Sequence, residues 1–288
     1  MEIIILGSSG TIPTKERNLA SVALIFEGEI LLFDCGEGTQ RQFLKYNLNI
    51  SKISNVFISH LHLDHYLGLF GLLETINLIN PKKIINIFGP SGTKKIFEKY
   101  KNTEIIEITK KKNILIEKKY QISTFKLNHG SYPCFAYIFQ EKNRLKFYEK
   151  KAKAKGLKGP MFTEIQKKKK LKINGKIVHL SEISYEIKGK KIVYATDTLP
   201  SKSTIKNSEK ADILIHDSTY SKELEDEAKT NNHTTTKQAA NIAKTAKVKK
   251  LILFHISQRH KNYKILEDEA KKVFKETVCA KDGLIIKL

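Results

Sequence analysis

The sequence predicts a single layered α/β domain. Short apolar segments typical of strands alternate with segments of helical periodicity in both halves of the chain. Polar side chains, among them histidine and aspartate, follow directly after several of the apolar segments, at the strand ends where α/β folds place their functional sites. The 288 residues, 40% of them hydrophobic, are enough for one domain with a sizeable core.

The first half of the chain contributes mainly strands. Residues 21–26 and 29–33 are apolar segments on either side of Glu27-Gly28, a pattern that predicts a hairpin. Residues 55–59 are typical of a buried strand, and they lead directly into a cluster of histidines. The apolar positions between residues 67 and 76 suit a helix. Two further strands are predicted at residues 3–6 and 84–88, each followed by glycine.

The second half repeats this alternation. Strands are predicted at residues 191–195, 213–215 and 251–254, and a helix at 235–246. The polar side chains that follow the three strands are Asp197, His216, Asp217 and His255.

A strongly basic segment separates the two halves. The chain has a formal net charge of +22, and residues 142–176 hold 14 cations against two carboxylates. The apolar periodicity of this segment is poor, and it contains a turn at Gly159-Pro160. We therefore predict one domain over residues 1–288 with a basic insertion at 142–180. Such clustered charge indicates a polyanionic partner such as nucleic acid, whereas evenly spread lysines indicate only a solvated surface.

The composition argues against membrane proteins and disulfide-linked proteins. The sequence contains no run of eighteen apolar residues, and its first residues lead straight into a predicted strand without a basic leader. The cysteines, Cys35, Cys134 and Cys279, are far apart and lack CxxC spacing. We therefore expect a cytoplasmic protein with reduced thiols and no membrane attachment.

The segment at residues 60–65 predicts a metal site, because it holds three imidazoles and one carboxylate within six residues. His60 and His62 can point to one ion, while Asp64 and His65 serve a second. Further ligands must come from elsewhere in the chain. The candidates are His129, Asp197 and His255, although a lone residue of this kind at a strand end is more often a cap or a satisfied polar group than a ligand.

These features resemble the metallo-β-lactamase superfamily and, more narrowly, the ribonuclease Z family of tRNA 3′-processing endonucleases. The likeness covers nearly the whole chain and implies an αββα four-layer sandwich with the metals between the edges of two sheets. The segments that carry it are 6–10, 13–18, 32–41, 60–65, 194–198, 215–219, 232–235 and 254–259.

The resemblance implies a site for two zinc ions per subunit, with manganese or another divalent ion as an alternative. One ion would be held by His60, His62 and His129, the other by Asp64, His65 and His255, with Asp197 between them.

The resemblance also implies hydrolysis that leaves a 3′-hydroxyl on the tRNA and a 5′-phosphate on the trailer. Asp64 would orient or deprotonate the attacking water, and His233 would protonate the leaving oxygen. Asp217, in a position that is commonly Glu, would raise the pKa of His233. The alternative for His233 is a loop residue that precedes the helix near Thr235. Asp34 is either support for a ligand histidine or a turn-stabilising residue.

The same resemblance assigns substrate contacts. The insertion would be an arm that binds precursor tRNA, marked by Gly159 and Pro160. Lys15 and Arg17 suit phosphate contacts near the substrate 3′ end, with ordinary surface charge as the alternative. The arm lysines expected to contact phosphate are Lys167, Lys168, Lys169 and Lys170. Relatives of this family form homodimers, so we expect a homodimer.

Two other functions are compatible with the motifs. The first is another dizinc hydrolase of the superfamily, such as a small-molecule phosphodiesterase, which would not need a basic arm. The second is a nucleic-acid-binding protein on a decayed hydrolase scaffold. The presence of all seven expected ligands argues against decay.

Overall fold

The computed structural model describes residues 1–110 and 112–288, and these form two compact units. The first unit consists of residues 1–140 and 191–288, and the second of residues 141–190. No helix among the described residues is long and apolar enough to cross a membrane.

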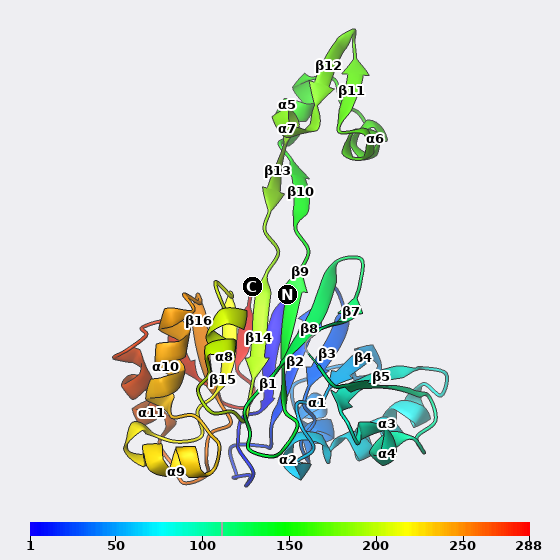
Figure 1. The fold of residues 1–288 in the computed structure, drawn as a ribbon. Helices are drawn as coiled ribbons and strands as arrows, with labels where there is room; N and C mark the ends of the chain where they lie inside the picture. The colour runs from blue at the N-terminus through cyan, green and yellow to red at the C-terminus, as the bar shows by residue number, and fades with distance from the viewer. Residues whose placement is uncertain (111) are drawn as a thin grey trace. The chain divides into compact units, whose positions relative to one another are not determined.

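The first unit contains two seven-stranded sheets, which Figure 1 shows face to face. Along one sheet the strands are β18 (Ile285–Lys287), β1 (Glu2–Gly7), β2 (Ser21–Phe26), β3 (Glu29–Phe33), β4 (Ile53–Phe57), β5 (Ile85–Pro90) and β6 (Thr103–Ile108). Along the other they are β17 (Thr277–Cys279), β16 (Lys250–Phe254), β15 (Ile213–Asp217), β14 (Lys191–Ala195), β9 (Phe135–Glu141), β8 (Tyr120–Lys126) and β7 (Lys112–Ile116).

Parallel pairing explains where the polar side chains gather. Strands β3 to β6 pair in parallel in the first sheet, and β14 to β17 pair in parallel in the second. Successive parallel strands need crossover connections, and the helical segments between them supply these. The carboxyl ends of the parallel strands in each sheet therefore meet at one edge, which positions the residues that follow them.

Helices cover the outer face of each sheet, so the first unit has the predicted αββα layers (Figure 1). On the first sheet, Phe43, Leu72 and Phe97 bury the apolar faces of three helices, and on the second, Ala240 and Leu266 do so for two. The helices of this unit are α1 (Thr39–Lys45), α2 (Leu63–Tyr66), α3 (Leu69–Ile79), α4 (Thr93–Phe97), α8 (Lys202–Asn207), α9 (Glu225–Thr230), α10 (Thr236–Thr245) and α11 (Tyr263–Lys271), with 3₁₀ turns η1 (Ile50–Lys52) and η2 (Lys222–Leu224).

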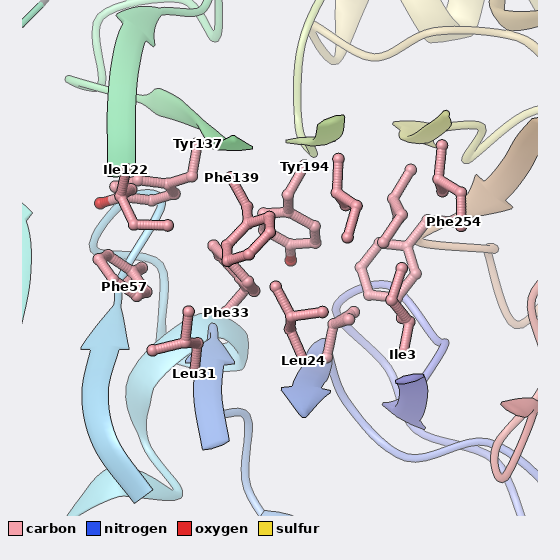
Figure 2. Packing of buried hydrophobic residues seen from close by; sticks show 14 of the residues in the cluster. Ile3, Leu24, Leu31, Phe33, Phe57, Ile122, Tyr137, Phe139, Tyr194 and Phe254 are labelled. Atoms are coloured by element: carbon pink, nitrogen blue, oxygen red, sulfur yellow. The ribbon is translucent and has the colours of Figure 1, made fainter. Parts of the chain in front are cut away.

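An aromatic core fills the space between the two sheets, as Figure 2 shows. Phe33 and Phe57 stack with ring centroids 5.1 Å apart, and Phe33 also meets Tyr194 of the opposite sheet at 5.7 Å. Burying a Phe side chain contributes several kcal/mol, on the order of the 3–5 kcal/mol lost when such a residue is cut to Ala. These contacts hold the two sheets of the sandwich together.

The helix predicted between residues 67 and 76 is observed as a helix that begins two residues later, at Leu69, because two loops approach closely just before it. Helix α2 ends at Tyr66 and α3 begins at Leu69, with Gly68 between them. A Cβ atom on Gly68 would lie only 2.0 Å from the carbonyl oxygen of Gly36, and the Gly68 amide donates to the carbonyl of Cys35. The interruption between α2 and α3 thus allows the loop that precedes α3 to pack closely against the loop that follows β3.

The second unit has a small core of its own. Ile165, Val178 and Ile183 are buried together with four other apolar side chains. Its elements are β10 (Arg144–Phe147), α5 (Glu149–Ala154), α6 (Met161–Lys168), β11 (Lys170–Ile173), β12 (Lys176–His179), α7 (Leu180–Ile183) and β13 (Ser184–Ile187). Strand β10 pairs with β13 and β11 with β12, both antiparallel. This core was not apparent from the apolar periodicity, because the elements that supply it are only four to eight residues long.

Candidate metal centre

Loops at the ends of four strands in the first unit bring the predicted ligands together. The 60–65 segment follows β4, where His62 caps α2, and Asp64 and His65 lie in the single turn of that helix. His129 follows β8, Asp197 follows β14 and His255 follows β16. The seven side chains, which the sequence spreads over almost 200 residues, fall into two groups of possible metal donors, and a third group joins Asp197 and His255 to His233.

The first donor set consists of three imidazoles and one carboxylate. Nε2 of His60 lies 2.9 Å from Nδ1 of His62, which in turn lies 3.4 Å from Nε2 of His129. Oδ2 of Asp197 is 3.6 Å from Nε2 of His60.

The second donor set shares Asp197 with the first. Oδ2 of Asp64 lies 3.4 Å from Nε2 of both His65 and His255. Asp197 presents Oδ1 to Nε2 of His255 at 3.3 Å and Oδ2 to Nε2 of His65 at 3.5 Å. The Asp197 carboxylate therefore contacts donors of both sets.

The spacing of these donors fits a divalent cation. Ligands about 2.0–2.1 Å from a tetrahedral zinc ion lie roughly 3.4 Å from one another, which is close to most of the separations observed. Nε2 of His65 is buried and has no hydrogen-bond partner, so a bound cation would satisfy it. Imidazole and carboxylate are also the donor types that zinc prefers among nitrogen and oxygen ligands.

The electrostatics of the site favour a bound positive charge. Burial, reinforced by His65, lowers the pKa of His60 well below its usual range. Burial would also lower the pKa of His65, but the carboxylates of Asp197, Asp64 and Asp34 outweigh it and raise that pKa well above its usual range. Burial would raise the pKa of Asp197, yet His255 and His65 bring it well below its usual range. Ionised carboxylates thus surround the centre, and a cation would neutralise them.

Several side chains of the centre sit on backbone of unusual conformation. Asp34, Asp197 and His255 each follow a strand and have φ angles of 52°, 51° and 60°. A left-handed conformation costs a non-glycine residue on the order of 1–3 kcal/mol, and it persists only where its surroundings over-determine it. No sequence signal predicted this backbone conformation.

Asp34 contacts His65, one of the predicted ligands, as the first of the two alternatives from the sequence requires. Its Oδ2 atom lies 2.7 Å from Nδ1 of His65 and accepts a hydrogen bond from the hydroxyl of Tyr194, also at 2.7 Å. The carboxyl group of Asp34 is fully buried. Sequence reasoning did not identify Tyr194, which lies 160 residues away and looks like an ordinary core tyrosine of β14.

His233 and Asp217 form a pair beside the donor sets. Nδ1 of His233 lies 2.8 Å from Oδ2 of Asp217, so the shorter aspartate still reaches the histidine. Burial would lower the pKa of His233, but the charge and hydrogen bond of Asp217 raise it to about 9. A capping box between Thr235 and Gln238 begins α10 and fixes the loop that holds His233.

A cavity of about 460 Å³ opens onto the centre. His62, His129, Asp197, His233 and His255 line it, and Tyr132 and Arg259 belong to the same cavity.

The predicted substrate residues fall into two groups. Lys15 and Arg17 line a neighbouring pocket of the first unit, and Gln258 lines both this pocket and the cavity. Arg17 is only 7% exposed and donates from Nη2 to the carbonyls of Ser257 and His260, so it is not an ordinary surface charge. The second unit holds the remaining ones, all exposed: Gly159, Pro160, Lys167, Lys168, Lys169 and Lys170.

Comparisons with known proteins agree with this fold and site. Residues 1–279 match a protein-family model described as Anti-Pycsar protein Apyc1. A protein named Ribonuclease Z from Pyrococcus horikoshii is 38% identical over 98% of this chain and 94% of its own length. One of the same name from Methanothermobacter thermautotrophicus is 35% identical over 100% and 97%.

Solved structures give the same result. The crystal structure of the short form of human tRNase Z matches 100% of this chain and 99% of its own with a TM-score of 0.71 and 26% identity. The metallo-β-lactamase fold protein YhfI from Bacillus subtilis matches 99% and 98% with a TM-score of 0.74. Its identity of 21% supports the fold alone.

Proposed function

Because the chain belongs to the ribonuclease Z family, and also to the family described as Anti-Pycsar protein Apyc1, we propose that its two donor sets hold two zinc ions for phosphodiester hydrolysis. The chain is a tRNase Z-type endoribonuclease that processes the 3′ end of tRNA, as its full-length relatives and the human tRNase Z structure indicate. Its substrate is therefore precursor tRNA. The observation that carries the metal proposal is the convergence of seven donors around a shared Asp197.

We propose that His60, His62 and His129 hold one ion and that Asp64, His65 and His255 hold the other, with Asp197 contacting both. The donor spacing near 3.4 Å and the orphaned Nε2 of His65 support this assignment. Zinc suits these ligands best, and manganese or another divalent ion is the alternative. Ions bound here would lower the pKa of a water molecule and neutralise charge on the phosphate.

We propose that different side chains activate the water and protonate the leaving oxygen during hydrolysis. Asp64 faces the second donor set and would orient the attacking water and accept its proton. Attack on phosphorus breaks the bond to the 3′ oxygen of the tRNA, and His233 would give that oxygen a proton. Asp217 holds the imidazole of His233 in place, and its charge and hydrogen bond raise the pKa of that imidazole to about 9. The products would be a 3′-hydroxyl on the tRNA and a 5′-phosphate on the trailer.

We propose that the second unit is the arm that binds tRNA away from the reacting bond. Residues 142–176 carry 14 cations, and the four lysines at 167–170 are all exposed. Exposed lysines suit the phosphate backbone, whose recognition depends on charge and duplex form and not on sequence. Lys15 and Arg17 would contact phosphate closer to the reacting bond, where their pocket adjoins the cavity at Gln258.

The proposed assembly and location follow the family. We propose a homodimer, by analogy with relatives. We also propose a cytoplasmic location, which the three buried free thiols Cys35, Cys134 and Cys279 support, because reduced cysteines are typical of that compartment.

A 3′-extended precursor tRNA tests the proposal directly. The zinc-loaded protein is incubated with the precursor, and both product ends are mapped by sequencing. We expect cleavage at or just beyond the discriminator nucleotide, with a hydroxyl on the tRNA end. Absence of cleavage with zinc, manganese and other divalent ions would refute the proposal.

A further inference from the structure

Two buried carboxyl groups occupy matching positions in the two sheets of the first unit. Asp34 follows β3 in the first sheet, and Asp217 ends β15 in the second. Both are fully buried. Neither is a member of the donor sets around Asp197, so each needs hydrogen-bond donors of its own.

Each carboxyl group is bound twice by one hydroxyl residue. Asp34 accepts from the amide of Ser59 at 2.7 Å and from its Oγ at 2.8 Å. Asp217 accepts from the amide of Thr219 at 3.0 Å and from its Oγ1 at 2.7 Å. In each sheet one hydroxyl residue thus binds a buried carboxylate through both its amide and its side chain, Ser59 at both oxygens of Asp34 and Thr219 at Oδ1 of Asp217.

Each carboxyl group also contacts one imidazole directly, His65 for Asp34 and His233 for Asp217. Each hydroxyl oxygen also lies near Nδ1 of that imidazole, at 3.4 Å for Ser59 and His65 and at 3.2 Å for Thr219 and His233, and lies closer to a second imidazole. Nδ1 of His60 lies 3.0 Å from Oγ of Ser59, and Nδ1 of His255 lies 3.0 Å from Oγ1 of Thr219.

The protons in these contacts have one consistent arrangement. A hydroxyl has a single proton, and an ionised carboxylate can only accept, so Ser59 and Thr219 donate to Asp34 and Asp217. Their oxygens are then left to accept from Nδ1 of His60 and His255. An imidazole that carries its proton on Nδ1 presents a lone pair on Nε2. In both histidines Nε2 is the atom that faces Asp197 within its donor set.

We propose that Ser59 and Thr219 are positioning residues, through which each buried carboxylate fixes two imidazoles instead of one. This inference rests on the proposed metal site. Asp34 holds one histidine of each donor set, His65 directly and His60 through Ser59. Asp217 holds the proposed proton donor His233 directly and the ligand His255 through Thr219. In the second sheet, the buried carboxylate of Asp217 therefore orients both a proposed metal ligand and the proposed proton donor.

A merely structural role for the two hydroxyls has a different consequence. In that case their loss lowers the stability of the fold and leaves the affinity of the folded protein for metal unchanged. Thr219 also lines the cavity, so metal affinity is measured in the absence of RNA. Thr124 provides a matched control, since it is fully buried and its hydroxyl donates to a main-chain carbonyl, that of Ala136, and not to a carboxylate beside the donor sets.

The test compares Thr219→Val, Thr219→Ser, Ser59→Ala and Thr124→Val with the parent protein. Zinc affinity and stoichiometry are measured by chelator competition, the absorption spectrum is recorded with Co²⁺, and thermal unfolding is followed in parallel. Loss of a residue that orients a ligand histidine typically weakens metal binding about 10- to 100-fold. We expect at least about a 10-fold loss and an altered Co²⁺ spectrum for Thr219→Val and for Ser59→Ala. Thr219→Ser, which keeps the hydroxyl, and Thr124→Val should bind zinc as the parent does.

The outcomes separate the inference from the proposed function. A parent protein that binds no divalent ion overturns both. A parent that binds ions while Thr219→Val and Ser59→Ala bind them equally well overturns the inference alone. So does a Thr219→Ser variant as weak as Thr219→Val. If Thr219→Val does not fold, Ser59→Ala and the comparison of Thr219→Ser with the parent decide the matter.

Discussion

The metal centre and the basic second unit hold charge in opposite ways. In the centre, Asp34 and Asp197 are buried, and each carboxylate faces His65, Asp34 at 2.7 Å and Asp197 at 3.5 Å. In the second unit, Lys167 to Lys170 are exposed, and the ion pair that Lys168 makes with Glu164 lies on the surface of α6. Surface pairs of this kind contribute about 0–1 kcal/mol, whereas breaking a buried charged pair costs several times more.

This difference predicts how each region responds to substitution. In the centre, replacing one buried side chain should greatly lower activity, because water cannot take the place of the group that is removed. In the second unit the lysines act as a group, because each exposed cation can substitute for its neighbour on a phosphate backbone. Four experiments sharpen the comparison.

The largest effect is expected for Asp64→Ala. The substitution removes a proposed ligand and the group that would accept the proton of the attacking water, so cleavage of precursor tRNA should fall by about 10⁴-fold. Hydrolysis of a small chromogenic phosphodiester should fall in parallel, since the chemistry itself is abolished. Initial rates with both substrates measure this. The control is Asp268→Ala, which changes an exposed aspartate on α11. An Asp64→Ala variant as active as the parent would contradict the proposed mechanism.

Removal of the second unit should separate binding from chemistry. Residues 140 and 191 are cross-strand neighbours, and the amide of Glu141 donates to the carbonyl of Lys190, so an Asn-Gly turn can replace residues 142–189. Because several phosphates of the tRNA would no longer be neutralised, cleavage of precursor tRNA should fall by about 10³-fold. The small phosphodiester should be hydrolysed at the parent rate. A deletion variant that still trims tRNA normally would show that the second unit is not the tRNA-binding arm.

His233→Ala should have an intermediate effect that depends on the leaving group. General acid catalysis contributes about 10²–10⁴-fold, and we expect a loss near the lower end, about 10²-fold, for precursor tRNA, whose 3′ oxygen needs a proton. A nitrophenyl phosphodiester has a stable leaving anion and should lose much less. The ratio of the two losses is the measurement. Equal losses with both substrates would mean that His233 does not act as the proton donor.

The smallest effect is expected for the lysine group at 167–170. Changing all four to Gln should weaken tRNA binding by about 10-fold at moderate salt and flatten its salt dependence, by roughly 0.7–0.9 in logarithmic slope for each phosphate that is no longer neutralised. Binding titrations at several salt concentrations measure both quantities. The matched control changes Lys94, Lys95, Lys99 and Lys101, four exposed lysines of the first unit, to Gln. If the control alters the slope as much, total charge and not the second unit governs binding.

Much of the first unit was predictable because its signals are local. Strands such as β2 and β3 follow from apolar segments around a glycine turn, and their predicted bounds of 21–26 and 29–33 match the structure. Helix α10 was predicted over 235–246, within one residue of its observed bounds of Thr236–Thr245. The short elements of the second unit were not predictable in this way, since a strand of four residues gives too little periodicity to detect.

The sequence by itself determined which donors are available and in what order, because the types of ligand side chains and their motif spacing are properties of the chain. Only the tertiary structure decided how those donors are held. The contact between Tyr194 and Asp34 joins residues of opposite sheets, and the left-handed backbone of Asp197 and His255 exists only because packing enforces it. Which nitrogen of His60 or His255 faces the donor sets depends on Ser59 and Thr219, whose hydroxyls have a defined direction only in the folded protein.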